Sequence, residues 1–104
     1  MGGTYKFNTA CIPGCFIDTS GKLTISTTWS ADQRMFPVVG GKTIKNNSNF
    51  NTYIGLYDSD RKFIRRASVA AGGVTTVNNN ARYALFGIST VNLQDALTAN
   101  FTMY

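Results

Sequence analysis

Short runs of β-branched and aromatic residues alternate along the chain with clusters of glycine, asparagine, serine and aspartate. Runs of this kind, bounded by turn residues, are typical of strands, and no helical period persists for long between them. Only Asn92–Leu97 is predicted as a helical turn, with Asn92 as its cap. The strands are predicted at Cys15–Asp18, Leu23–Thr28, Phe36–Val39, Thr43–Lys45, Thr52–Tyr57, Phe63–Ala67, Val74–Val77, Arg82–Ser89 and Asn100–Met103.

Two of these segments show the period of two that a strand imposes on its side chains. In Thr52–Tyr57, Tyr53, Gly55 and Tyr57 share one face. The segment Arg82–Ser89 is apolar on both faces, which predicts a central strand of a sheet. About eight or nine short strands in a chain of this length predict an all-β fold, a two-sheet antiparallel β-sandwich of the jelly-roll type.

The turns between the strands carry their own chemistry. Asp18–Lys22 is predicted as a hairpin turn, and Asp58–Arg61 as a tight turn between two strong strands. Asp58-Ser59-Asp60 also resembles the start of a calcium loop, but Lys62 and Phe63 stand where further oxygen ligands should follow. The favoured interpretation is a turn in which aspartate side chains accept hydrogen bonds from backbone amides.

Composition limits the class of protein. The 104 residues, of which 43% are hydrophobic and 12% aromatic, predict one ordered domain over residues 1–104, cut from a longer chain. The net charge is +5, and only Arg61–Arg66 is densely basic. That segment is read as a solvated strand and turn, or alternatively as a patch for an anionic glycan, teichoic acid or nucleic acid. No RNA-binding signature supports nucleic acid as the partner.

No apolar stretch is long enough to span a bilayer, so no membrane insertion is expected, and no signal-peptide pattern opens the chain. Two cysteines, Cys11 and Cys15, flank Pro13-Gly14, a pair suited to the centre of a type II turn. Such a turn could bring the sulfurs together as a disulfide, although two reduced thiols are the favoured alternative. Two cysteines without a histidine supply only half of a tetrahedral zinc site, so no metal and no cofactor is expected.

The sequence contains few of the residues that catalysis usually requires. The chain has no histidine and no glutamate, and a serine or cysteine nucleophile would lack a base. Asp58 and Asp60 share one turn and cannot face each other across a sugar as glycosidase carboxylates do. The protein is therefore predicted not to be an enzyme.

Aromatic, acidic and guanidinium side chains are the candidates for ligand binding, because a flat ring with a few polar groups suits a sugar. Burial of these rings in the core or at a subunit contact is the alternative. Arg65 and Arg66 should lie on opposite sides of their strand, so at least one should be exposed. The candidate binding residues are Trp29, Asp32, Arg34, Tyr53, Tyr57, Arg65 and Arg82.

The order of several segments resembles a known family. The segments concerned are Cys15–Leu23, Trp29, Met35–Val38, Gly40–Ile44, Ile54–Ile64, Ala81–Phe86 and Asn92-Leu93. Together they resemble the carbohydrate-binding-like jelly-roll domains of bacteriophage tail-fibre, baseplate and appendage proteins.

This resemblance implies a host-attachment module on a virion or other extracellular surface, which binds a host cell-surface polysaccharide or glycan and assembles as a homotrimer. The alternatives are a structural or oligomerisation domain of a virion protein without a ligand, and a carbohydrate-binding module cut from a bacterial surface enzyme. Fold alone does not decide between them.

Overall fold

The computed structural model describes residues 3–8 and 11–104, without the side chains of residues 11–13. Its regular secondary structure is almost entirely strand. Its elements are β1 (Gly3–Lys6), β2 (Cys11–Ile17), β3 (Leu23–Asp32), β4 (Phe36–Pro37), β5 (Thr43–Asn46), β6 (Thr52–Tyr57), β7 (Phe63–Val69), β8 (Val74–Thr76), β9 (Tyr83–Ile88), α1 (Leu93–Ala96) and β10 (Asn100–Met103).

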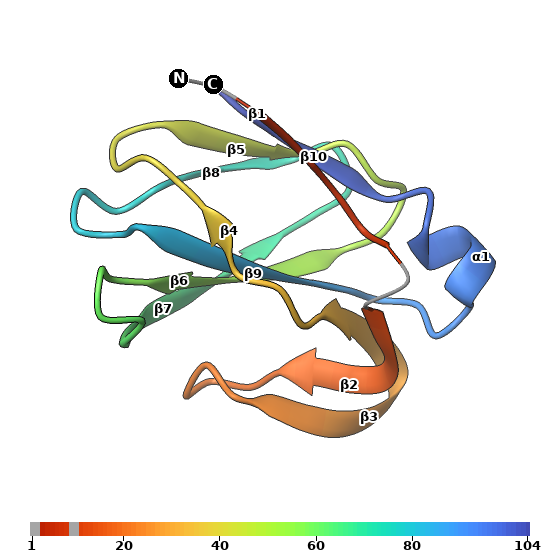
Figure 1. Cartoon of the computed structure of the whole chain (residues 1–104). Coiled ribbons are helices and arrows are strands. Elements are labelled where there is room, and N and C mark those ends of the chain that lie inside the picture. The colour runs from red at the N-terminus through yellow and green to blue at the C-terminus, as the bar shows by residue number, and fades with distance from the viewer. Residues whose placement is uncertain (1–2, 9–10) are drawn as a thin grey trace.

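The strands form two antiparallel sheets packed face to face (Figure 1). One sheet has the order β1-β10-β5-β8, and the other has the order β2-β3-β9-β6-β7 with β4 also paired to β9. From β5 onward the chain changes sheet at every connection except the β6–β7 hairpin. This is the jelly-roll sandwich that the strand pattern predicts.

Strand β9 is central, as its apolar character on both faces predicts. It pairs with β6 along one edge and with β3 and β4 along the other. The side chains of Ala84, Phe86 and Ile88 face the main core between the sheets, and all three are fully buried. Phe86 stacks on Phe101 of the opposite sheet, with ring centroids 4.2 Å apart.

A second, smaller core lies on the other face of β6 and β9. There the long β2–β3 hairpin curls beneath the sheet (Figure 1), and Ile17 packs with Tyr57 and Leu85. Four further side chains pack against this cluster: Met35, Tyr53, Phe63 and Tyr83. Both faces of the central strands are therefore covered, by the first sheet on one side and by the hairpin on the other.

Two aspartates hold the two turns of this second sheet. The Asp18 carboxylate accepts bonds from the backbone N–H groups of Ser20 and Lys22, at 2.8 and 3.0 Å. The Asp58 carboxylate accepts bonds from the N–H groups of Asp60 and Lys62 in the same pattern, both at 2.9 Å. The prediction of an aspartate-stabilised turn at Asp58 is thus confirmed.

The helical turn is also confirmed, because the Asn92 side chain accepts a bond from the Asp95 N–H at 3.1 Å. The turn predicted at Pro13-Gly14 is wrong. Those residues lie inside β2, where the pairing with β3 changes register and Gly14 adopts a φ of 82°. Backbone pairing with β3 thus holds Pro13 and Cys15 in the strand on either side of Gly14, a constraint that local turn propensity does not reveal. Within the described ranges, no helix is long and apolar enough to cross a bilayer.

Candidate functional site

Three stacked side chains form the main candidate for a ligand-binding surface. The Trp29 and Tyr53 rings are nearly parallel, with centroids 4.2 Å apart and planes inclined by 6°. The Arg66 guanidinium carbon lies 3.9 Å from the centroid of the same Tyr53 ring. Two groups this close cannot share one face of the ring, so the phenol lies between the indole and the guanidinium. We call these three residues the Trp29 stack.

An irregularity in the β2–β3 pairing positions Trp29. Cys15 pairs with Ile25 and Pro13 pairs with Ser30, so β3 has four residues where β2 has only Gly14. The Ser26 hydroxyl oxygen accepts bonds from the N–H groups of Thr28 and Trp29, at 3.1 and 3.2 Å. This bulge redirects β3 and brings the indole against β6.

The other members of the stack come from β6 and β7. Tyr53 and Gly55 lie on the outer face of β6, and Arg66 of β7 is paired opposite Gly55. The Arg66 guanidinium also donates a bond of 2.8 Å to the Ile17 carbonyl oxygen, which holds it beneath the β2–β3 hairpin. Arg66 and Trp29 are both half-buried, so the stack is anchored from below and partly open to solvent.

Tyr57 is not part of this surface, although it shares a face with Tyr53 as predicted. Only 3% of Tyr57 is exposed, and its hydroxyl donates a bond of 2.5 Å to the Gly21 carbonyl oxygen. Burial raises the pKa of Tyr57 to about 12, and the nearby Asp18 charge adds to the shift. Its assignment as a ligand contact is wrong, because the β2–β3 turn covers it.

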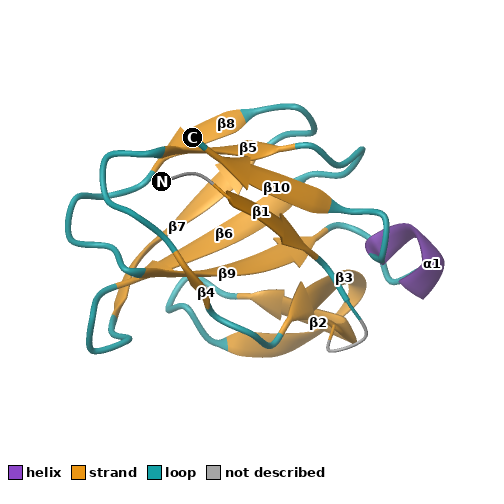
Figure 2. Ribbon diagram, turned by 45° about the horizontal axis from the view of Figure 1, so that its top comes forward, coloured by secondary structure: helices purple, strands orange, loops and turns teal. Residues whose placement is uncertain are grey.

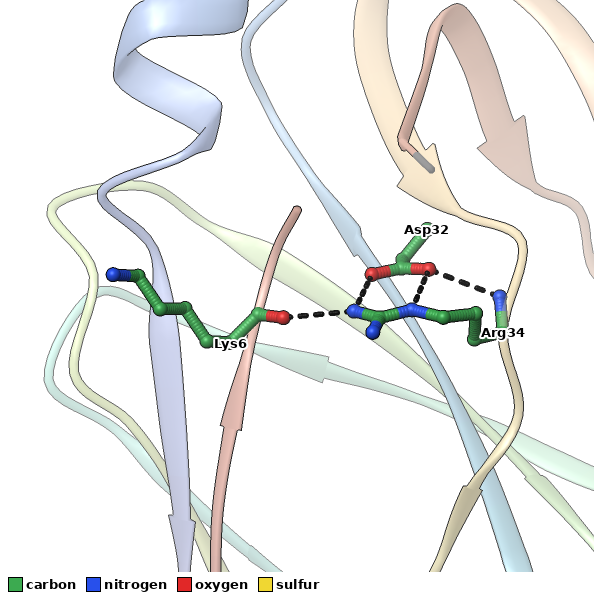
Figure 3. A network of polar contacts seen from close by, with 3 residues as sticks. All are labelled: Lys6, Asp32 and Arg34. Carbon is green, nitrogen blue, oxygen red and sulfur yellow. Dashed lines mark hydrogen bonds and ion pairs between the residues drawn. The ribbon is translucent and has the colours of Figure 1, made fainter. Parts of the chain in front are cut away.

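Asp32 and Arg34 form an ion pair that links two segments of the chain (Figure 3). The Asp32 side chain is fully buried and lies 2.6 Å from one Arg34 terminal nitrogen, and it also accepts the Arg34 Nε–H at 3.0 Å. That terminal nitrogen donates a further bond of 2.9 Å to the Lys6 carbonyl oxygen. The pair therefore ties β1 to the β3–β4 connection, and the hydrogen bond from Asp32 raises the pKa of Arg34.

Arg82 lies in the connection between β8 and β9, and Arg65 of β7 contacts the same connection, away from the Trp29 stack. Arg65 Nε donates to the Asn78 side-chain oxygen at 2.6 Å, and Arg82 donates to the Asn79 carbonyl oxygen at 2.9 Å. Arg65 and Arg66 thus diverge to opposite sides of β7, as predicted. Both are half-buried, however, so the expectation that one of them is exposed is not met.

Apart from the buried Tyr57, the predicted site residues lie in three places. Trp29 and Tyr53 come together, Asp32 pairs with Arg34, and Arg65 and Arg82 meet a separate loop. Sequence reasoning missed Arg66 as a member of the stack. The alternation of side chains along a strand could have indicated this role, because it puts Arg66 on the outer side of β7, beside the face of β6 that carries Tyr53.

The structure describes the side chain of only one of the two cysteines. Cys15 is buried on β2. The Cys11 side chain lies outside the described residues, so the Cys11–Cys15 disulfide stays a prediction. In the described part of the chain, no cluster of three or more His, Cys, Asp or Glu side chains is placed to hold a metal ion.

Comparison of this chain with protein-family models, with curated protein sequences and with solved structures found no match.

Proposed function

We propose that this protein is a non-catalytic attachment module that binds a cell-surface glycan through the Trp29 stack. On this proposal it belongs to a bacteriophage tail fibre or appendage, as the sequence resemblance implies. The single observation that supports glycan binding best is the parallel stacking of Trp29 on Tyr53. A held, partly open indole is a suitable platform for the apolar face of a sugar ring.

The surroundings of the indole add polar groups of the right kind. Tyr53 covers one face of the ring, and the aromatic contacts of the described residues place no second ring on the other face. Thr27 and Thr28, which precede Trp29 on β3, are both exposed. Their hydroxyl groups can exchange hydrogen bonds with sugar hydroxyls while the indole supplies the apolar contact.

The test is a glycan-array screen that includes bacterial wall polysaccharides, followed by fluorescence titration of Trp29 with any glycan that binds. Trp29 is the only tryptophan, so the emission reports on this site alone. We expect saturable quenching or a blue shift, with binding lost in Trp29→Ala and kept in Val74→Ala. Val74 is a matched control, because it is an exposed apolar residue on the other sheet. A folded protein that binds no glycan at millimolar concentration would contradict the proposal.

A second candidate is a structural or oligomerisation module, and one residue favours it. Ile25 is 90% exposed on β3, beside the exposed Leu23. Among the described residues, β3 pairs between Leu23 and Trp29 with β2 alone, so its other edge is open. Exposed apolar side chains on an open strand are suited to contact with another chain. The homotrimer is part of our proposal for the same reason.

Sedimentation velocity at increasing protein concentration tests this candidate. We expect a trimer that dissociates when Ile25→Lys places a charge on the β3 surface. A monomer at all concentrations in the unaltered protein would remove the support that Ile25 gives to assembly.

A further inference from the structure

We propose that the connection Asn78–Arg82, together with Arg65, binds the oxyanion groups of an acidic polysaccharide. This second site is independent of the Trp29 stack. Arg82 directly precedes the start of β9, whereas Trp29 lies beside Ser30, which pairs with Ile88 at the end of β9. The five-residue rise along β9 separates Arg82 from the Trp29 end of the strand by about 17 Å. Arg65 is next to Arg66 of the stack in the sequence, but it points to the opposite side of β7.

The surface here is hollowed on both sides of Asn79. One hollow, of about 350 Å³, is lined by Val38, Val39, Gly40, Asn79 and Arg82. The other, of about 360 Å³, is lined by Arg65, Thr76, Val77, Asn78 and Asn79. Since Asn79 lines both, the hollows adjoin, with one arginine in each. A polymer with repeated acidic groups can therefore place one group beside each arginine.

The connection is held in place by contacts with neighbouring segments of the protein. Its backbone is bonded to neighbouring segments, because the Arg82 N–H donates to the Tyr57 carbonyl oxygen at 2.8 Å and the Val38 N–H donates to the Arg82 carbonyl oxygen at 2.9 Å. Gly40 approaches the Asn79 backbone so closely that a Cβ there would collide with it. A preorganised loop loses little entropy when a ligand binds.

The two arginines are anchored but keep donors for a ligand. Arg65 donates through Nε and one terminal nitrogen, to Asn78, Thr75 and Thr76. Arg82 donates through one terminal nitrogen, to Asn79 and Ala81. The hydrogen bonds among residues 3–8 and 11–104 leave the second terminal nitrogen of Arg65, and Nε and the second terminal nitrogen of Arg82, without a protein acceptor. Guanidinium groups fixed in this way suit carboxylate and phosphate oxygens.

The electrostatic surroundings favour an anion. The turns that connect β2 to β3, β4 to β5, β6 to β7 and β8 to β9 gather at one end of the sandwich (Figures 1 and 2). They carry the cations Lys22, Lys42, Arg61, Lys62 and Arg82 against the anions Asp18, Asp58 and Asp60. Asp18 and Asp58 are engaged by the amides of their own turns, so their charge is partly compensated. This end of the sandwich therefore carries a net positive electrostatic potential.

An acidic polysaccharide fits this place better than a nucleic acid. Binding of single strands requires aromatic rings on which bases can stack. The adjacent ring of Tyr83 has the Arg61 guanidinium over it, 4.9 Å from its centroid, and Tyr57 is buried. The hollows instead offer the side-chain amides of Asn78 and Asn79 beside the arginines, and these can bond to sugar hydroxyls.

The test is a titration followed by backbone amide NMR, using four probes: an oligogalacturonate, a glycerol phosphate oligomer, a neutral maltooligosaccharide and a thymidine oligonucleotide. We expect one or both of the acidic probes, the oligogalacturonate and the glycerol phosphate oligomer, to shift the Asn78–Arg82 amides, and the neutral probe to leave them unchanged. Which acidic probe binds identifies the group as carboxylate or phosphate. The Arg82→Gln variant should bind about tenfold more weakly or worse, the effect of losing a charge-assisted hydrogen bond.

Arg61→Gln is the matched control, because it removes the same charge at the same end of the molecule but does not line either hollow. Its affinity should change less than about twofold, in keeping with screening of exposed charges. Equal losses in the two variants would overturn the site in favour of a diffuse field, and so would tighter binding of the oligonucleotide or no binding of either acidic probe. Trp29→Ala should leave this binding intact, so the outcome is separate from that of the glycan proposal.

Discussion

The indole of Trp29 lies parallel to the phenol ring of Tyr53, with ring centroids 4.2 Å apart. The two residues are far apart in the sequence and belong to β3 and β6, which are not neighbours in the sheet, because β9 lies between them. The bulge at Ser26–Trp29 lets β3 cross over the outer face and bring the rings together. The contact is thus a product of the tertiary fold, and its energy can be measured.

A double-mutant cycle on Trp29 and Tyr53 should detect coupling. We expect Trp29→Ala and Tyr53→Ala to interact by about 0.5–1.5 kcal/mol in the free energy of unfolding, the usual worth of a stacked aromatic pair. Urea denaturation of the two single variants and the double variant measures it. Additive effects of the two substitutions would show that the stacked geometry contributes nothing to stability.

Replacement of Phe86 should be among the most damaging changes. Its ring is fully buried, stacks on Phe101 and contacts Tyr5 and Phe36. We expect Phe86→Ala to lower the free energy of unfolding by about 3–5 kcal/mol, because it removes packing from both sheets at once. Ile25→Ala, at a side chain 90% exposed, should change it by less than about 0.5 kcal/mol. Chemical denaturation of dilute samples compares the two, and similar losses would contradict the assignment of the core.

Asp32→Asn tests the ion pair between the buried Asp32 carboxylate and the partly exposed Arg34 guanidinium. The substitution keeps the shape of the side chain but leaves the Arg34 guanidinium without its charged partner. We expect a loss of about 1.5–3 kcal/mol in the free energy of unfolding, in the range for hydrogen bonds to charged groups. Asp95→Asn, at an exposed position on α1, serves as the control and should be near neutral. Equal stability of Asp32→Asn and the unaltered protein would show that the pair contributes nothing.

Tyr57 should make the fold sensitive to alkali. Its pKa is raised to about 12 in the folded protein from an ordinary value of 10.0, so the unfolded chain loses this proton first. The stabilisation is complete below pH 10 and is lost as the pH rises from 10 through 12. Denaturation curves across this interval should show falling stability, and Tyr57→Phe should flatten the fall. An unchanged slope in that variant would assign the effect to other groups, among them Tyr5, whose pKa burial also raises.

The alternation of residue types was sufficient to predict most of the strands and the class of fold. The apolar character of both faces of Arg82–Ser89 placed that strand at the centre of a sheet, where β9 lies. Asn92 marked the start of the single helical turn. These features are local, because strand periodicity, capping and turn formation depend on residues within a few positions of one another.

The sequence by itself therefore determined most of the strands, the sandwich and the aspartate-held turn at Asp58, but it did not reveal β1 or the start of β2 at Cys11. Only the tertiary structure decided which of the candidate side chains are buried and which meet. It covered Tyr57 with the β2–β3 turn, paired Asp32 with Arg34, and placed Arg66 against Tyr53. The physical reason is that burial and stacking depend on contacts between segments distant in the chain, and periodicity along one strand carries no information about what packs against its faces.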